Sequence, residues 1–253
     1  MRSARTEPSS ARRSPSREGG ETRPGFPQSI GIGFVAVAAA ATVGFLLVPS
    51  MIVGAPLEPV MGLVQKIFYF HVPCATMLFL STFVCAGGSV AYLFKGSEAG
   101  DRLAASAGEL AVLFGACTLV TGPLWGRKAW GVWWQWDARL TSSLLLELIM
   151  IAYLLARRYA GPAGRKLSAA LALFAAIDVP LVYKSVDIWR TVHPRTTVVP
   201  TLDPRMRPAF WSAFALMLLV WSLLLALRLR LENARAELAE LRLEVEDLLE
   251  AAS

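Results

Sequence analysis

Six stretches of this chain are apolar for long enough to cross a lipid bilayer as α-helices. A helix needs about 20 mainly apolar residues to span the hydrocarbon core, and a chain that is 55% hydrophobic supplies several such windows. The mean hydropathy of +0.49 also argues against an ordinary soluble domain. The sequence therefore predicts an all-α membrane protein with six transmembrane helices. The predicted spans are Ile30–Val48, Val72–Phe94, Glu109–Leu124, Leu140–Ala156, Leu167–Tyr183 and Ala209–Leu227.

The distribution of positive charge predicts how these helices are oriented. Lys and Arg gather on the cytoplasmic side of membrane helices. With both termini inside, sixteen of the 25 basic residues fall in cytoplasmic segments and nine in outer segments. The sequence therefore predicts that both termini are cytoplasmic. This placement also accounts for the net charge of +6 without nucleic acid as a partner.

The two ends of the chain differ from the apolar region between them. Residues 1–29 are rich in Arg, Ser, Pro, Gly and Glu, and this composition predicts a disordered basic cytoplasmic tail without a signal peptide. Residues 30–227 are the predicted membrane domain. Residues 228–253 are predicted to continue the last helix as a cytoplasmic coiled coil of about three heptads, on the order of 35 Å long. Its a/d seam is Leu227, Leu231, Ala234, Leu238, Leu241, Val245 and Leu248.

A few reactive or ionisable side chains lie inside the predicted spans. Cys74, Cys85 and Cys117 are odd in number and lack a C-x-x-C spacing, so they are interpreted as small packing residues. Glu147 and Asp178 are candidates for function, because a charge in the membrane costs at least about 2.5 kcal/mol on insertion scales. The alternative is that each acid is protonated or paired with a neighbouring helix.

The segment between the third and fourth spans, "WGRKAWGVWWQWD" at positions 125–137, holds five of the eight tryptophans. Thr121-Gly122-Pro123 is a predicted helix stop before it, and Asp137 is a predicted N-cap of the next helix. Tryptophans also form belts at membrane interfaces, but five rings exceed what a belt needs. A glycine-containing loop of indoles suits a flat, apolar, conjugated ligand. The predicted platform is Trp125, Trp130, Trp133, Trp134 and Trp136.

The two histidines of the chain suggest what that ligand is. His71 begins the second span and His193 lies between the fifth and sixth, so both are expected on the same outer face as the tryptophans. A single histidine is more often structural than a ligand, but neutral imidazole is a good axial ligand for haem iron. Outer basic residues would suit the haem propionates, with no single partner assigned. The candidates are Arg127, Lys128, Arg139, Arg190 and Arg195.

These residues resemble a known family. The 125–137 segment resembles the WWD domain of bacterial haem-handling proteins. Its continuation "ARLTSSLLL", together with "YFHVP" and "VYKSVDIWRTVHP", is similar to the CcmC branch of cytochrome c maturation. The resemblance covers roughly Gln65 to Arg207. The "PKET"-like continuation that is usual in CcsA-like synthases is absent.

The resemblance implies a function, a cofactor and partners. It implies that haem b is held non-covalently on the periplasmic face of the bacterial inner membrane, with His71 and His193 as axial ligands to the iron. The five tryptophans, Asp137 and Arg139 are the other implied cofactor contacts. It further implies delivery of haem to the chaperone CcmE, together with the ABC transporter subunits CcmA and CcmB and the small membrane protein CcmD. The resemblance also implies a protein that handles and transfers haem and is not an enzyme.

Three other readings remain open on the sequence. A b-type electron-transfer subunit usually places its histidines within the helices, whereas both histidines here are expected at the outer ends. A CcsA-like cytochrome c synthase would attach haem itself, but the missing continuation and modest outer loops argue against it. A transporter of another planar or cationic substrate would also use tryptophans, and an absorption spectrum distinguishes it from a haem protein.

Overall fold

The computed structural model describes residues 31–194 and 198–252. Six helices in them are long and apolar enough to cross a membrane, which confirms the predicted all-α membrane class. Two short 3-10 turns, η1 (Leu63–Ile67) and η2 (Gly161–Ala163), precede α2 and α5. The long helices are α1 (Ile32–Gly54), α2 (Phe68–Lys95), α3 (Glu98–Trp130), α4 (Ala138–Tyr159), α5 (Gly164–Ile188) and α6 (Arg207–Ala252).

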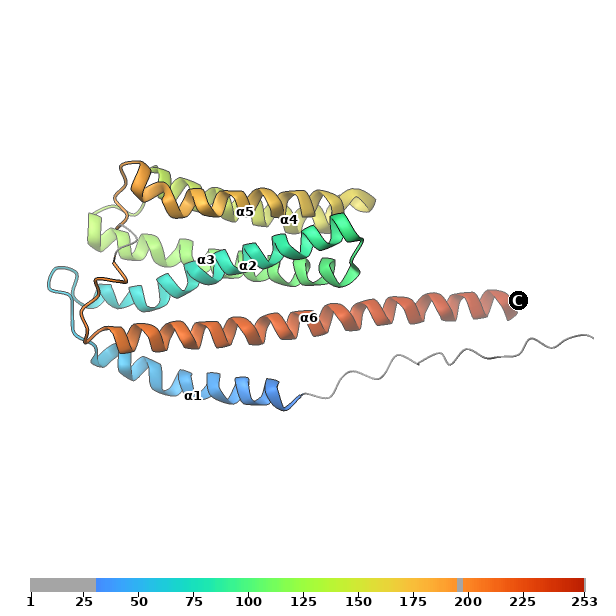
Figure 1. Ribbon diagram of the computed structural model, residues 1–253, viewed down its shortest axis with the longest axis horizontal. Helices are drawn as coiled ribbons and strands as arrows, with labels where there is room; N and C mark the ends of the chain where they lie inside the picture. Colours follow the sequence, from blue (N-terminus) through green and yellow to red (C-terminus); the bar gives the residue numbers. More distant parts are fainter. Residues whose placement is uncertain (1–30, 195–197, 253) are drawn as a thin grey trace, which may run out of the picture.

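The helices pack as three antiparallel pairs (Figure 1). The α2–α3 pair lies in the middle, with α4–α5 on one side and α1–α6 on the other. The connections α1–α2, α3–α4 and α5–α6 all lie at one end of the bundle, which we call the loop end. The start of α1 and the end of α6 lie at the opposite end (Figure 1). Consequently the tryptophan-rich segment and both histidines share the loop end, as the sequence predicted.

Helix α3 is much longer than the predicted span of 109–124. It begins after Ser97, whose side-chain oxygen accepts a hydrogen bond from the backbone N–H of Gly100, and it runs through Pro123 to Trp130. The predicted stop at 121–123 is therefore wrong. Membrane helices tolerate an internal proline, because neighbouring helices and Thr side chains satisfy the freed backbone groups. The helix ends only at Gly131, whose φ of 79° is readily adopted by glycine.

Close approach of α3 and α4 depends on two glycines of α3. A Cβ at Gly108 would lie 2.5 Å from the ring of Tyr153, and one at Gly115 would lie 1.8 Å from the carboxylate of Glu147. Both distances are too short for real atoms. Two bulky side chains of α4 therefore pack directly on bare backbone of α3, and this contact fixes the spacing between the two helix pairs.

An ion cluster ties the same helix pairs together away from the loop end. The buried Asp101 of α3 accepts two hydrogen bonds from Arg157 of α4, at 2.6 and 2.5 Å, and one from Arg165 of α5, at 3.0 Å. Such a pair is costly to break, because removal of one partner leaves a buried charge uncompensated. The cluster therefore fixes the end of the bundle that is opposite the loop end.

Helix α6 continues without a break beyond the predicted sixth span. It is 46 residues long, or about 69 Å at 1.5 Å per residue, and it projects beyond the other helices (Figure 1). Arg228 pairs with Glu109 of α3, and Arg230 lies over the ring of Phe34 in α1. Beyond these contacts the larger apolar residues of the seam are exposed, namely Leu231, Leu238, Leu241, Val245 and Leu248. The helical extension is thus present, whereas the coiled coil stays a prediction, and the predicted tail at 1–29 lies outside the described residues.

Candidate functional site

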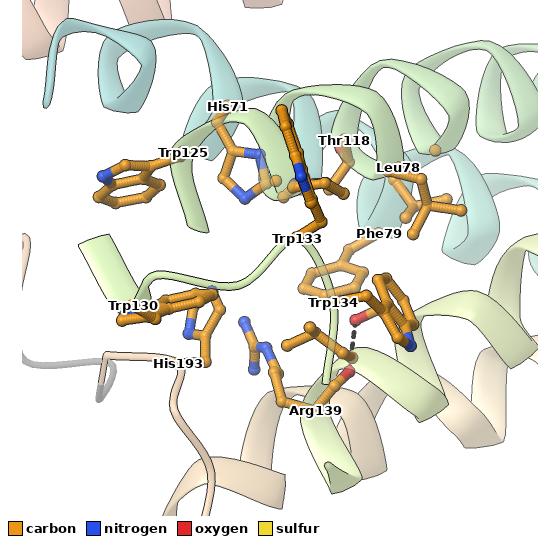
Figure 2. Close-up of a pocket in the computed structure, with 17 residues that line it drawn as sticks. His71, Leu78, Phe79, Thr118, Trp125, Trp130, Trp133, Trp134, Arg139 and His193 are labelled. Carbon is orange, nitrogen blue, oxygen red and sulfur yellow. Dashed lines mark hydrogen bonds between the residues drawn. The ribbon is translucent and has the colours of Figure 1, made fainter. Parts of the chain in front are cut away.

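A cavity of about 720 Å³ lies at the loop end, among α2, α3, the start of α4 and the α5–α6 connection (Figure 2). This volume includes the mouth of the cavity, which is open to solvent. The lining is mainly apolar and aromatic, with a few polar groups. It consists of His71, Ala75, Leu78, Phe79, Gly115, Thr118, Leu119, Gly122, Pro123, Trp125, Trp130, Trp133, Trp134, Arg139, Leu140, Ser143 and His193.

His71 lies in the first turn of α2, and its ring orientation is fixed by a threonine. Its Nδ1 is 2.9 Å from the hydroxyl oxygen of Thr121 on α3. The hydroxyl proton of Thr121 is donated to the carbonyl of Cys117 at 2.7 Å. The threonine oxygen therefore accepts the Nδ1–H of His71, and the lone pair of Nε2 remains free to bind a metal ion. The edge of Trp125 also packs against the imidazole.

His193 lies in the α5–α6 connection and presents the same tautomer by a different contact. Its Nδ1 is 2.8 Å from the carbonyl oxygen of Pro194, which can only accept a hydrogen bond. Nδ1 therefore carries the proton, and Nε2 has the free lone pair. Burial, reinforced by the positive charge of Arg139, lowers the pKa of His193 to about 4. The ring is thus neutral at pH 7, the form that ligates metals.

Four of the five predicted tryptophans line the cavity, and they surround it instead of forming one flat platform. Trp125 and Trp130 belong to α3, whereas Trp133 and Trp134 belong to the segment before α4 (Figure 2). Trp136 does not line the cavity: it is 77% exposed and contacts Trp134 edge to face. A loop was expected to carry all five rings. Because α3 extends to residue 130, a rigid helix carries the first two.

Arg139 is the only cationic side chain that lines the cavity within the described part of the chain. One guanidinium nitrogen donates to the backbone carbonyls of Val182 and Tyr183 on α5, at 2.6 and 3.1 Å. No described carboxylate forms a salt bridge with it, and Figure 2 shows the guanidinium directed toward the cavity. Its free N–H groups are therefore available to an anionic group of a ligand.

The other predicted basic candidates lie elsewhere. Arg127 donates to the carbonyl of Gly131 and lies over the ring of Trp133, and Lys128 is exposed. Arg190 lines a second, open hollow, which His193 also lines. Arg195 lies outside the described residues. These placements leave Arg139 as the cation best placed for a ligand inside the cavity.

Asp137 does not line the cavity, and its two carboxylate oxygens have separate partners. Oδ1 accepts the backbone N–H of Leu140 at 2.8 Å, which confirms the predicted N-cap of α4. Oδ2 accepts the hydroxyl of Thr191 and the backbone N–H of Val192, the latter at 3.0 Å. No local sequence pattern signals this second set of contacts, because the residues are more than 50 positions apart.

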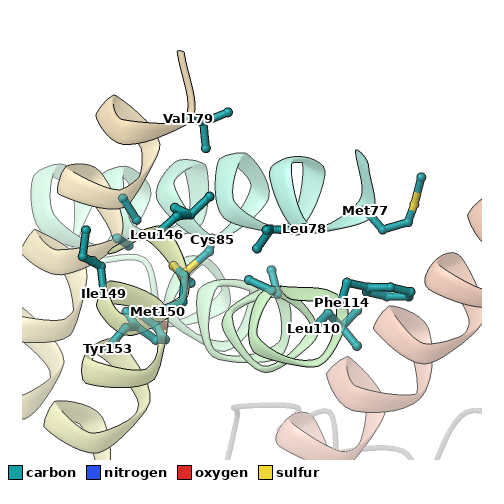
Figure 3. Packing of buried hydrophobic residues seen from close by; sticks show 14 of the residues in the cluster. Met77, Leu78, Cys85, Leu110, Phe114, Leu146, Ile149, Met150, Tyr153 and Val179 are labelled. Atoms are coloured by element: carbon teal, nitrogen blue, oxygen red, sulfur yellow. The ribbon is translucent and has the colours of Figure 1, made fainter. Parts of the chain in front are cut away.

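The apolar floor of the cavity is the part that sequence reasoning missed. Leu78 and Phe79 of α2 and Leu119 of α3 line it, and Leu78 also belongs to the buried core shared by α2, α3, α4 and α5 (Figure 3). Glu147, one of the two acids predicted inside spans, packs behind Gly115 in this floor without lining the cavity. Glu147 and Asp178 are buried, and each has one carboxylate oxygen with no hydrogen-bond partner in the described residues.

The fold and site define a class of protein: a multi-pass all-α membrane protein with an aromatic pocket and two metal-competent imidazoles at one end. Comparison with known proteins is specific within that class. The family model described as "Heme exporter protein C" matches residues 25–248, so the chain belongs to the CcmC family. The match is wider than the resemblance seen in the sequence, because it includes α1 and most of the α6 extension.

Individual relatives agree with this assignment. "Heme exporter protein C" of Escherichia coli (strain K12) is 33% identical over 205 residues, covering 75% of this chain and 81% of the relative. The protein of the same description from Bradyrhizobium diazoefficiens is 32% identical over 199 residues, covering 78% and 75%. A "Putative cytochrome c biosynthesis ccmC-like mitochondrial protein" of Marchantia polymorpha is 32% identical over 144 residues, covering 57% and 61%.

Proposed function

We propose that the cavity binds haem b non-covalently as cargo, with His71 and His193 as the axial ligands of the iron. One observation carries the proposal: both imidazoles line one cavity, and each uses its Nδ1–H in a hydrogen bond that leaves Nε2 free. Partners of this kind orient metal-bound histidines and raise their basicity. Three described cysteines are free, and none lines the cavity, which supports a non-covalent mode.

The remaining lining residues fit the two ends of a haem molecule. The tryptophan rings and the floor of Leu78 and Phe79 suit the apolar porphyrin and its vinyl edge, because aromatic side chains contribute large apolar contact area. The guanidinium of Arg139 suits a propionate, because it forms charge-assisted hydrogen bonds with carboxylates. Since Arg139 is held by the backbone of α5, the cation is placed before the ligand arrives.

The site is proposed to hold and transfer haem and not to carry out a reaction. The relatives are described as haem exporters and as a cytochrome c biosynthesis protein, and this supports delivery to the chaperone CcmE during cytochrome c maturation. The subunits CcmA and CcmB and the small protein CcmD are the other proposed partners. His193 also lines the open hollow beside Arg190, and we propose that a recipient protein approaches this ligand from that hollow.

An absorption spectrum of the purified full-length protein tests the proposal. Two imidazole ligands to haem iron should give the spectrum of a six-coordinate low-spin haem, extractable without breaking a covalent bond. A protein that inserts correctly but shows no haem absorption after incubation with haem would favour the transporter of another planar substrate. A haem that is reduced by quinol at a catalytic rate would favour the b-type electron-transfer subunit. Attachment of haem to apocytochrome by the isolated chain would favour the CcsA-like synthase.

The sidedness of the site is a separate proposal. The bias of sixteen to nine basic residues favours cytoplasmic termini, which puts the loop end on the periplasmic face of the inner membrane. A reporter that is active only outside the cytoplasm should be silent when fused after Ser253. The same reporter fused after Gln135 of a truncated chain should be active. The opposite pattern would place the cavity on the cytoplasmic side and contradict periplasmic delivery.

A further inference from the structure

We propose that Thr191 is a positioning residue that, together with Asp137, latches the His193 segment onto the start of α4. The proposal rests on the proposed function, because His193 matters only if it binds haem iron. It assigns a role to Thr191, and it changes the role of Asp137 from a contact of the cofactor to a support of its ligand. The latch is defined as the hydrogen bonds that join Asp137, Thr191, Val192 and His193.

The segment that carries His193 has little regular structure to hold it. Helix α5 ends at Ile188, and the last backbone hydrogen bond of its C-terminus is from Trp189 to Ser185. Beyond that point the backbone N–H of Val192 and the hydroxyl of Thr191 both donate to Oδ2 of Asp137. The hydroxyl oxygen of Thr191 in turn accepts the backbone N–H of His193 at 3.1 Å. The chain thus folds around one carboxylate oxygen immediately before the histidine.

The anchor at the other side of the latch is rigid. Asp137 uses its other oxygen to cap α4 at Leu140, so the carboxylate cannot turn without loss of the cap. Two residues later, Arg139 donates hydrogen bonds to the backbone carbonyls of Val182 and Tyr183 on α5. The first turn of α4 therefore holds both the end of α5 and the segment that follows it. Because bonds to a carboxylate are stronger than neutral ones, this latch is well suited to hold a loop residue in place.

His71 needs no such device, and this difference makes the latch testable. It belongs to a helix, it is 8% exposed, and Thr121 orients it from the neighbouring helix. Loss of the latch should therefore release one axial ligand and leave the other ligand, the tryptophans and Arg139 in place. Without the latch, His193 would no longer be held in position to bind the iron, although every residue that contacts the ligand is still present.

The experiment compares four variants of the full-length protein by absorption and electron paramagnetic resonance spectroscopy. Thr191→Val removes the hydroxyl with little change of shape, and Thr191→Ser keeps it. Asp137→Asn keeps a good N-cap residue, but its single oxygen cannot accept both the cap and the latch bonds. Thr141→Val is the matched control, because Thr141 is exposed on the first turn of α4 and outside the latch.

We expect Thr191→Val and Asp137→Asn to convert a large part of the haem from low spin to five-coordinate high spin. The equilibrium for His193 binding to iron should shift by roughly ten- to hundredfold, the factor that one or two charge-assisted hydrogen bonds contribute. Added imidazole should restore the low-spin spectrum by taking the vacated position. Thr191→Ser and Thr141→Val should keep the wild-type spectrum and show no response to imidazole.

The latch is overturned if Thr191→Val and Asp137→Asn both keep an unchanged low-spin spectrum that does not respond to imidazole. It is also overturned if Thr191→Ser is as defective as Thr191→Val, because a general intolerance of substitution would then explain both. A wild-type protein with no low-spin haem spectrum would instead overturn the proposed function. Size-exclusion profiles of all variants separate misfolding from ligand loss.

Discussion

Replacement of His71 with alanine is expected to abolish the six-coordinate low-spin spectrum of the bound haem, and so is replacement of His193. Each substitution removes one of the two axial nitrogens, and no other histidine exists in the chain to replace it. The double variant should lose both ligands and most of its bound haem. Measurement of the Soret band and of the haem-to-protein ratio after purification checks both expectations.

The matched control for these substitutions is Trp136→Phe. This ring is exposed and outside the cavity, so its replacement should leave the spectrum unchanged. Replacement of one lining tryptophan should have an intermediate effect, because three other rings remain. The assignment of the ligands fails if the double histidine variant still inserts, keeps an unchanged low-spin spectrum and loads the chaperone normally.

Removal of the charge of Arg139 is expected to produce the second largest effect. Arg139→Gln should lower haem affinity by roughly ten- to hundredfold, the range for loss of hydrogen bonds to a charged group. Glutamine retains N–H groups that can donate to the α5 carbonyls, so the brace to Val182 is better preserved than with alanine. The loss of affinity should appear as a higher dissociation constant in haem titrations, with the low-spin spectrum unchanged at saturation.

Arg127→Gln is the control for that measurement. Arg127 carries the same charge near the same tryptophans, yet it lies outside the cavity. It should leave the affinity nearly unchanged. Equal haem affinities for wild type and Arg139→Gln would show that the propionates are bound elsewhere. A haem ester that lacks both propionate charges should bind the two proteins equally, so a difference seen with haem but not with its ester assigns the effect to a propionate.

The sequence allowed much of the fold to be predicted, because hydropathy over about 20 residues is a property of each segment alone. All six spans were found, and so were both histidines and the cap at Asp137. The end of α3 was misplaced because Gly122 and Pro123 are stop signals in water but are tolerated in a membrane bundle. Helix boundaries of this kind depend on neighbours that the local sequence does not show.

The cavity itself was less predictable than its aromatic rim. Composition indicated a tryptophan platform, but which rings face inward depends on where α3 ends. Trp136 was therefore grouped with the four tryptophans that line the cavity, although it does not line the cavity itself. Leu78 and Phe79 of the apolar floor cannot be distinguished in the sequence from the other apolar residues of the same span. The contact of Asp137 with Thr191 joins two segments more than 50 residues apart, and no local pattern encodes such a pairing.

The cavity is built from separate helix pairs: α2 and α3 supply His71, Trp125 and Trp130, whereas α4 and the segment after α5 supply Arg139 and His193. Haem bound to both histidines would therefore act as a cross-brace between them. Consider a partner protein that binds more tightly when the two helix pairs are further apart. Bound haem lowers the affinity for this partner, and by thermodynamic reciprocity the bound partner lowers the affinity for haem by the same factor. A partner that binds a surface away from the porphyrin can therefore promote the release of haem.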